Sequence, residues 1–144
     1  MSPTILIADD DRESAMLCEN YLHRCGYRVL LASGGVECLT ILRQEAPAVI
    51  VASVNMPWGG ADGLLDCLSE ESNSLPGPNV ILTGHTASEN VTALREMPGV
   101  FRYLRKPFLM GRLLDDVRAI ELGLRDASRP NWSLRIRQTP VACH

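Results

Sequence analysis

The chain has 144 residues, of which 46% are hydrophobic and 22% charged, and its formal net charge is −3 at pH 7. These values predict one soluble globular domain that is large enough to bury its own core. The negative net charge argues against a nucleic-acid binder, and no run approaches the ~20 apolar residues that span a membrane. The first apolar run has no basic segment ahead of it, so we expect no signal peptide and a cytoplasmic location.

The cysteines and histidines indicate neither a disulfide framework nor a zinc site. The cysteine count is odd, no CxxC pair occurs, and no histidine has a cysteine or histidine at ligand spacing. Cys18, Cys38 and Cys67 each lie beside a leucine in a helix-like segment, where a thiol behaves as a small hydrophobe. The five cysteines, Cys18, Cys25, Cys38, Cys67 and Cys143, are therefore predicted to be reduced thiols, mostly in the core.

The first half of the chain alternates strand-like and helix-like segments. Residues 5–8 form an apolar run, and Asp11 is suited to cap the helix that follows it. The apolar stripe of that helix has a helical period and is closed by Gly26; its members are Leu17, Cys18, Tyr21, Leu22 and Cys25. Residues 27–32 are typical of a strand. Gly34 and Gly35 then lead into a helix that must end before Pro47, with Val36, Leu39 and Leu42 as its apolar positions.

The second half continues the alternation. Residues 48–54 are continuously apolar, as in a strand covered on both faces, and a Gly-rich loop (58–63) and a short helix around residues 64–68 follow. Residues 69–79 predict a loop, residues 80–82 a strand, residues 86–95 a helix with a capping box, and residues 100–104 a strand. The last helix carries a stripe of Leu113, Val117, Ile120 and Leu124. Residues 1–124 thus form the predicted domain, and residues 125–144 an irregular basic tail or linker.

Polar side chains follow the predicted strands. Asp9 and Asp10 follow the first, Ser53 ends the third, Thr83 follows the fourth and Lys106 follows the last. Five alternating strands and helices predict an α/β doubly wound parallel sheet, in which functional groups gather at the carboxyl ends of the strands. Adjacent carboxylates repel each other, so a hard cation or a lysine is expected to compensate Asp9 and Asp10.

These residues, in this order, resemble the receiver domain of two-component response regulators over roughly residues 4–124. The resemblance implies a flavodoxin-like (βα)5 fold with a five-stranded parallel sheet in the order 2-1-3-4-5. It implies that Asp9 and Asp10, with the backbone carbonyl of Asn55, bind Mg²⁺, and that Thr83 and Lys106 contact the phosphoryl group. Tyr103 stands where the family has its aromatic switch residue.

Two features depart from the family pattern. Ser53 stands four residues before Pro57, where the family has its phosphate-accepting aspartate. The loop after Pro57 includes Trp58 and an insertion of about two residues before Asp62 and Gly63, judged against that same pattern. Two carboxylates then face one lysine instead of three, so we expect weak Mg²⁺ binding and a resting state in which Lys106 pairs with Asp9 or Asp10.

The sequence therefore predicts a degenerate receiver: a signalling and protein-interaction module that is not an enzyme and is not phosphorylated at the usual position. Its expected partners are a histidine kinase, an output domain or another regulator. A homodimer through the fourth helix, fifth strand and fifth helix is also expected. An alternative is a flavodoxin-like nucleotide or flavin binder, although three aspartates after the first strand would repel a phosphate. Weaker alternatives are a Ser53 nucleophile activated by Asp9 or Asp10, and phosphorylation of Asp62.

Overall fold

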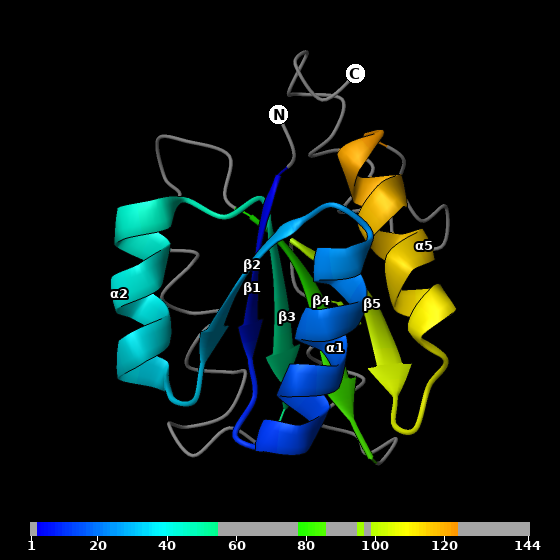
Figure 1. Cartoon of the computed structure of the whole chain (residues 1–144), viewed down its shortest axis with the longest axis horizontal. Coiled ribbons are helices and arrows are strands. Elements are labelled where there is room, and N and C mark those ends of the chain that lie inside the picture. The colour runs from blue at the N-terminus through cyan, green and yellow to red at the C-terminus, as the bar shows by residue number, and fades with distance from the viewer. Residues whose placement is uncertain (1–2, 55–77, 86–94, 97–98, 124–144) are drawn as a thin grey trace.

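The structure is a computed structural model and describes residues 3–54, 78–85, 95–96 and 99–123. Within these residues, five strands alternate with three helices (Figure 1). The bounds are β1 (Thr4–Ala8), α1 (Arg12–Arg24), β2 (Arg28–Ala32), α2 (Gly35–Glu45), β3 (Val49–Ser53), β4 (Asn79–Gly84), β5 (Val100–Arg105) and α5 (Met110–Glu121).

All five strands pair in parallel, in the order β2-β1-β3-β4-β5. This confirms the predicted flavodoxin-like sheet. The central strands are rich in Ile, Val and Leu and are buried along their length, as parallel strands covered on both faces must be. The register between β4 and β5 shifts at Val80 and Ile81.

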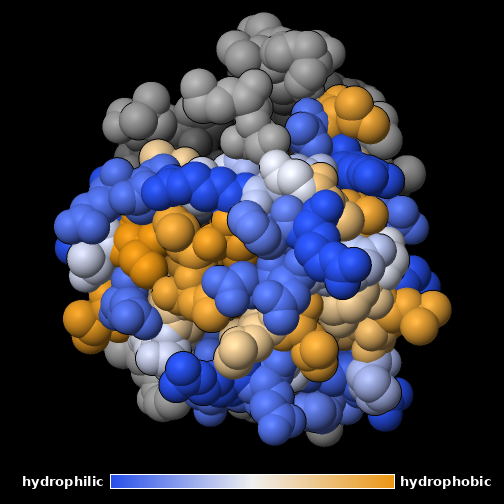
Figure 2. Space-filling view, viewed as in Figure 1, coloured by the Kyte–Doolittle hydropathy of each residue, from blue (hydrophilic) through white to orange (hydrophobic). Residues whose placement is uncertain are grey.

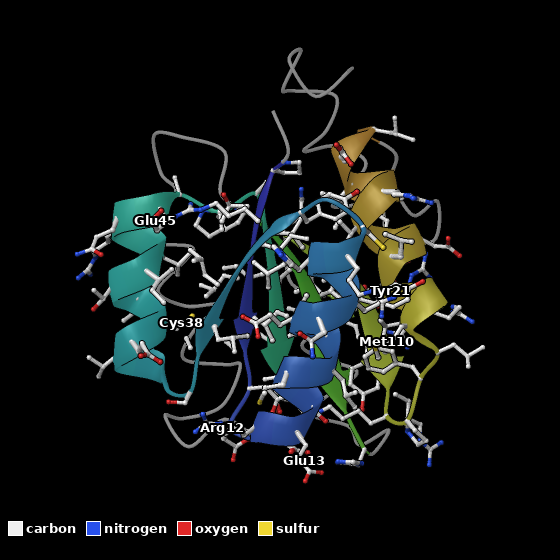
Figure 3. The ribbon with its side chains drawn as sticks, viewed as in Figure 1. Arg12, Glu13, Tyr21, Cys38, Glu45 and Met110 are labelled. Carbon is white, nitrogen blue, oxygen red and sulfur yellow. The ribbon has the colours of Figure 1, made fainter. Side chains whose placement is uncertain are left out.

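Side chains alternate between the two faces of the sheet and so form two core layers. Odd-numbered residues such as Ile7 and Val51 pack with α1 and α5, while even-numbered residues such as Leu6 and Ile50 pack with α2. In Figure 3, Cys38 on α2 and Met110 at the start of α5 lie on opposite sides of the strands. Ser53 continues the odd-numbered row of β3, and Asp9 continues that of β1.

The ends of α1 agree with the predicted signals. Asp11 is the N-cap, and its two carboxylate oxygens accept from the Ser14 amide (3.4 Å) and hydroxyl (3.1 Å). These hydrogen bonds lower the pKa of Asp11. Gly26 follows the helix with a φ of 98°, a conformation that other residues rarely adopt.

The predicted stripe of α1 is wrong at two positions. Leu17 is 63% exposed and Cys25 is also exposed, so Cys25 is not a core thiol. The buried positions are Ala15, Cys18 and Leu22, which follow a narrower i, i+3, i+7 line. Because α1 contacts the sheet along this line, the side chain of Leu17 lies at the edge of the contact. Cys25 lies just beyond the last residue of the helix.

The last helix agrees with its predicted stripe at Leu113, Val117 and Ile120, all of which are buried. The predicted position Leu124 lies outside the described residues. So do Cys67, Cys143, the Gly-rich loop, most of the predicted helices in 64–68 and 86–95, and the predicted tail. Of the described cysteines, Cys18 and Cys38 are buried thiols, as predicted.

On the face drawn in Figure 2, hydrophobic residues gather over β2, between α1 and α2. Val29, Leu30 and Leu31 of β2 are only partly buried, because β2 is an edge strand of the sheet. Among the described residues, no helix is long and apolar enough to cross a membrane.

Removing a core side chain of α5 should destabilise the domain far more than removing an exposed one. Leu113 is fully buried and Leu122 is 63% exposed. We expect Leu113→Ala to lower the free energy of unfolding by about 2–5 kcal/mol. The matched Leu122→Ala should change it by less than ~0.5 kcal/mol. Urea unfolding measures both, and equal losses would contradict the described packing of α5.

Candidate functional site

The parallel sheet gathers four of the predicted site residues at its carboxyl edge. Asp9 directly follows β1, Ser53 is the last residue of β3, Thr83 lies at the end of β4, and Lys106 directly follows β5. The register pairs Ser53 with Thr83. The Val54 amide donates to the Thr83 carbonyl (2.9 Å). These backbone contacts hold the ends of the strands at the edge in a defined arrangement.

An ion pair between Asp9 and Lys106 is the main electrostatic contact of this edge. Lys106 Nζ lies 2.8 Å from Asp9 Oδ2, and the two side chains are only 10% and 7% exposed. The other oxygen of Asp9, Oδ1, accepts from the Asp11 amide at 2.9 Å. The predicted pairing of Lys106 with Asp9 or Asp10 is confirmed for Asp9, whereas Asp10 is exposed.

Two buried hydroxyl side chains lie at the ends of the neighbouring strands β3 and β4. Ser53 is 4% exposed and Thr83 is 2% exposed. Among the described residues, no group of three or more His, Cys, Asp or Glu side chains is arranged to hold a metal ion. The described edge therefore combines the carboxylates of Asp9 and Asp10, one ammonium and two hydroxyls, with Asp11 beside them as the cap of α1. A serine hydroxyl reacts as a nucleophile only when an adjacent base activates it, and the one buried carboxylate is already paired with Lys106.

Tyr103 packs over Gly84, next to Thr83. A Cβ at Gly84 would lie 2.8 Å from the Tyr103 hydroxyl oxygen and 2.7 Å from Cγ2 of Val54. Only a residue without a side chain fits there unless Tyr103 or Val54 moves. Tyr103 is also partly buried against the core layer on the α2 side of the sheet. The predicted switch residue thus lies one position from the predicted phosphoryl contact, with its ring turned inward.

The sequence did not predict a partly buried ion pair between β5 and α5. Arg102 Nε on β5 donates to Asp116 Oδ1 on α5 at 2.8 Å, and Asp116 is 5% exposed. Burial raises the pKa of Asp116, and the charge of Arg102 opposes that rise. The available signal was an aspartate directly beside Val117, within the apolar stripe of the helix. This pair ties β5 to α5 and is remote from the ends of β1 and β3.

Two residues named from the sequence lie outside the described residues. They are Asn55, predicted to supply a carbonyl to a metal ion, and Asp62, the alternative phosphorylation position.

Comparison with known proteins supplies the family. A family model described as the response regulator receiver domain matches residues 5–118. The chain belongs to this family. The receiver fold and its place in two-component signalling, both implied by the resemblance, are thereby supported. The flavodoxin-like nucleotide or flavin binder is not favoured.

The relatives of this receiver domain include longer response regulators. Response regulator MprA of Mycobacterium bovis (strain BCG / Pasteur 1173P2) is 37% identical over 121 residues, which is 83% of this chain and 51% of that protein. MprA of Mycobacterium tuberculosis (strain ATCC 25618 / H37Rv) is 36% identical, with the same coverage. The chain spans about half the length of the curated relatives it matches.

Solved structures agree in fold. A response regulator signal receiver domain from Bermanella marisrubri is 26% identical with a TM-score of 0.69, covering 82% of this chain and 97% of that one. A CheY-like receiver domain protein from Methanospirillum hungatei has a TM-score of 0.75 at 20% identity, over 96% of this chain and 99% of that one. The second similarity supports the fold alone.

The Asp9–Lys106 pair should be energetically coupled, because both charges are buried. In a double-mutant cycle of Asp9→Asn and Lys106→Met, we expect a coupling free energy of about 0.5–3 kcal/mol. The exposed pair Arg28–Glu45, 2.8 Å apart with side chains 55% and 34% exposed, is the control. Its coupling, from Arg28→Met and Glu45→Gln, should stay below ~1 kcal/mol. Urea unfolding of the seven proteins, with the parent shared by both cycles, gives both values, and coupling no larger at Asp9–Lys106 than at the control would contradict the described pair.

Proposed function

We propose that this domain is a degenerate receiver: a signalling and protein-interaction module that is not regulated by aspartyl phosphorylation. The observation that carries the proposal is Ser53, a buried hydroxyl residue at the end of β3. It is at the position of the acceptor aspartate in the family pattern. Transfer from a phosphohistidine to an aspartate forms an acyl phosphate, which a serine cannot form.

The charges around Ser53 support the same conclusion. With Ser53 in the acceptor position, Asp9 is compensated by Lys106 at 2.8 Å, and the further negative charges of Asp10 and Asp11 are exposed to solvent. The electrostatic need for a cation is therefore smaller than in a pocket with three carboxylates. The resting arrangement is stable without any modification, and the domain works through its surface rather than through a phosphorylation cycle.

Receiver domains commonly bind Mg²⁺ at their acidic site. Here the donors would be the carboxylates of Asp9 and Asp10 and the backbone carbonyl of Asn55, an oxygen set of the kind that Mg²⁺ prefers. These oxygen ligands are chemically suited to Mg²⁺, but the carboxylate of Asp9 is also paired with Lys106. We therefore propose weak Mg²⁺ binding, where the ion would supply only charge compensation.

The partners follow from the family. Receiver domains of response regulators interact with histidine kinases and output domains. We propose a protein partner of this kind, a cytoplasmic location, and no enzymatic activity of the domain itself. No nucleic-acid or membrane contact by this domain is proposed. The remaining sequence-based alternative within the family is phosphorylation of Asp62, which the same labelling experiment tests.

The domain should not take up a phosphoryl group until a carboxylate is restored at position 53. We expect the natural sequence, incubated with acetyl phosphate and Mg²⁺, to show no added phosphoryl group by intact mass. Ser53→Asp should bind Mg²⁺ more tightly and become labelled, because three carboxylates then face Lys106. Without metal it should be less stable than the parent, for the same reason.

Ser53→Ala is the control, since it removes the hydroxyl without adding a charge. Labelling of the natural sequence that Ser53→Ala abolishes would overturn the proposal, because Ser53 would then be an acceptor. Labelling that Ser53→Ala retains but Asp62→Asn abolishes would show an alternative acceptor. A folded Ser53→Asp protein without labelling or Mg²⁺ affinity would mean that the rest of the pocket is not competent.

We also expect a modest homodimer that does not depend on phosphorylation. The face in question comprises the fourth helix, β5 and the outer side of α5, although Arg102 of β5 is engaged within its own chain by Asp116. Light scattering at high micromolar concentration should show a dimer fraction with or without Mg²⁺. Arg112→Glu, at an exposed position of α5 whose charge acts on Asp116 beside β5, should reduce it. A monomer under all these conditions would contradict the expectation.

A further inference from the structure

A cavity of about 210 Å³ lies between α1 and the segment that joins β5 to α5. Most of its wall is apolar. The wall is formed by β1, β3, the first half of α1, the segment that joins β5 to α5, and the first residue of α5. Figure 3 shows Met110, one of its lining residues, at the start of α5 on the side where α1 lies. The apolar lining residues are Ile7, Leu17, Cys18, Val51, Pro107, Phe108 and Met110.

The size and the wall of the cavity suit a small apolar molecule. An apolar cavity of about 150 Å³ in another protein stays dry and binds benzene, so ~210 Å³ admits a single ring with a substituent. Leu17 is 63% exposed although it lines the cavity, and a bound molecule would cover part of this leucine. Burial raises the pKa of the Cys18 thiol to about 11, which agrees with a wall that is poorly hydrated.

One end of the cavity is polar and electrically balanced. The polar lining residues are Asp9, Ser14, Thr83, His85 and Lys106, and the carboxylate of Asp9 and the ammonium of Lys106 compensate each other at 2.8 Å. An anion would be repelled by Asp9, and a cation by Lys106. An uncharged hydroxyl group can donate to a carboxylate and accept from an ammonium, which has three N–H donors. This end therefore favours a neutral hydroxyl group over a charged group.

We propose that this cavity binds a small, uncharged, single-ring molecule that carries one hydroxyl group, with the ring against α1 and the hydroxyl at the Asp9–Lys106 pair. The polar end of this cavity shares Asp9, Thr83 and Lys106 with the predicted Mg²⁺ and phosphoryl site, whereas Ser53 is not among the lining residues. A molecule bound there would contact Asp9 and Lys106 from the side of the sheet that α1 covers.

The test uses phenol as the probe and methionine methyl groups as reporters. Met110 lines the cavity, whereas Met16, on α1, does not. In the full chain labelled with [methyl-13C]methionine and assigned with Met110→Leu and Met16→Leu, phenol should shift the Met110 signal in a saturable manner and leave Met16 unchanged. Toluene should bind about 2- to 10-fold more weakly, because it lacks the hydrogen bond of the hydroxyl. Benzoate should bind more weakly than phenol.

Two matched variants on α1 locate the site. Leu17→Trp enlarges a side chain at the cavity and should weaken phenol binding at least about 10-fold, by filling space that the ring needs. Met16→Trp makes the same change at the neighbouring exposed position and should leave binding unchanged. Both positions are exposed, so both variants should fold. The proposal is overturned if Met110 does not respond up to the solubility limit of phenol. It is also overturned if benzoate binds more tightly than phenol, or if both variants weaken binding equally.

Discussion

The contact between Lys106 Nζ and Asp9 Oδ2 determines how charge is balanced at the carboxyl edge of the sheet. Each partner comes from the end of a different strand, and both side chains are almost fully buried. Breaking a buried pair leaves one charge without compensation, which is strongly destabilising. The pair therefore fixes the ends of β1 and β5 relative to each other, although β3 and β4 lie between these two strands. The hydrogen bond from the Asp11 amide to Asp9 extends this constraint to the cap of α1.

The chemistry that the edge supports follows from this pair and from Ser53. The ammonium of Lys106 already has a buried carboxylate partner in Asp9, and the neutral side chain of Ser53 adds no negative charge that would compete for the lysine. The ring of Tyr103 lies inward over Gly84 in the same arrangement. In this state the buried charge of Asp9 is compensated without phosphorylation. The proposed function therefore depends on contacts with protein partners at the surface of the domain.

Much of the fold was predictable because its signals are local. Continuous apolar runs gave the buried strands, Asp11 and Gly26 gave the ends of α1, and the order of polar residues at the strand ends predicted the pairing of Lys106. The features that the sequence did not predict correctly depend on tertiary contacts. The exposure of Leu17 is set by how α1 rests on the sheet, and a helical period alone does not specify which side of a broad stripe becomes buried. The Arg102–Asp116 pair depends on how α5 packs against β5, and the cavity is lined by elements far apart in the sequence, so a local sequence pattern predicts neither.

Because Lys106 compensates Asp9 at 2.8 Å, a metal ion at this edge should add little stability to the folded domain. The most direct test is the free energy of unfolding in urea with and without Mg²⁺, at matched ionic strength. A ligand that binds only the folded state adds RT ln(1 + [L]/Kd), so weak binding predicts a gain below ~0.5 kcal/mol at about 10 mM MgCl₂. A gain above ~1.5 kcal/mol under the same conditions would mean submillimolar binding and would contradict the claim.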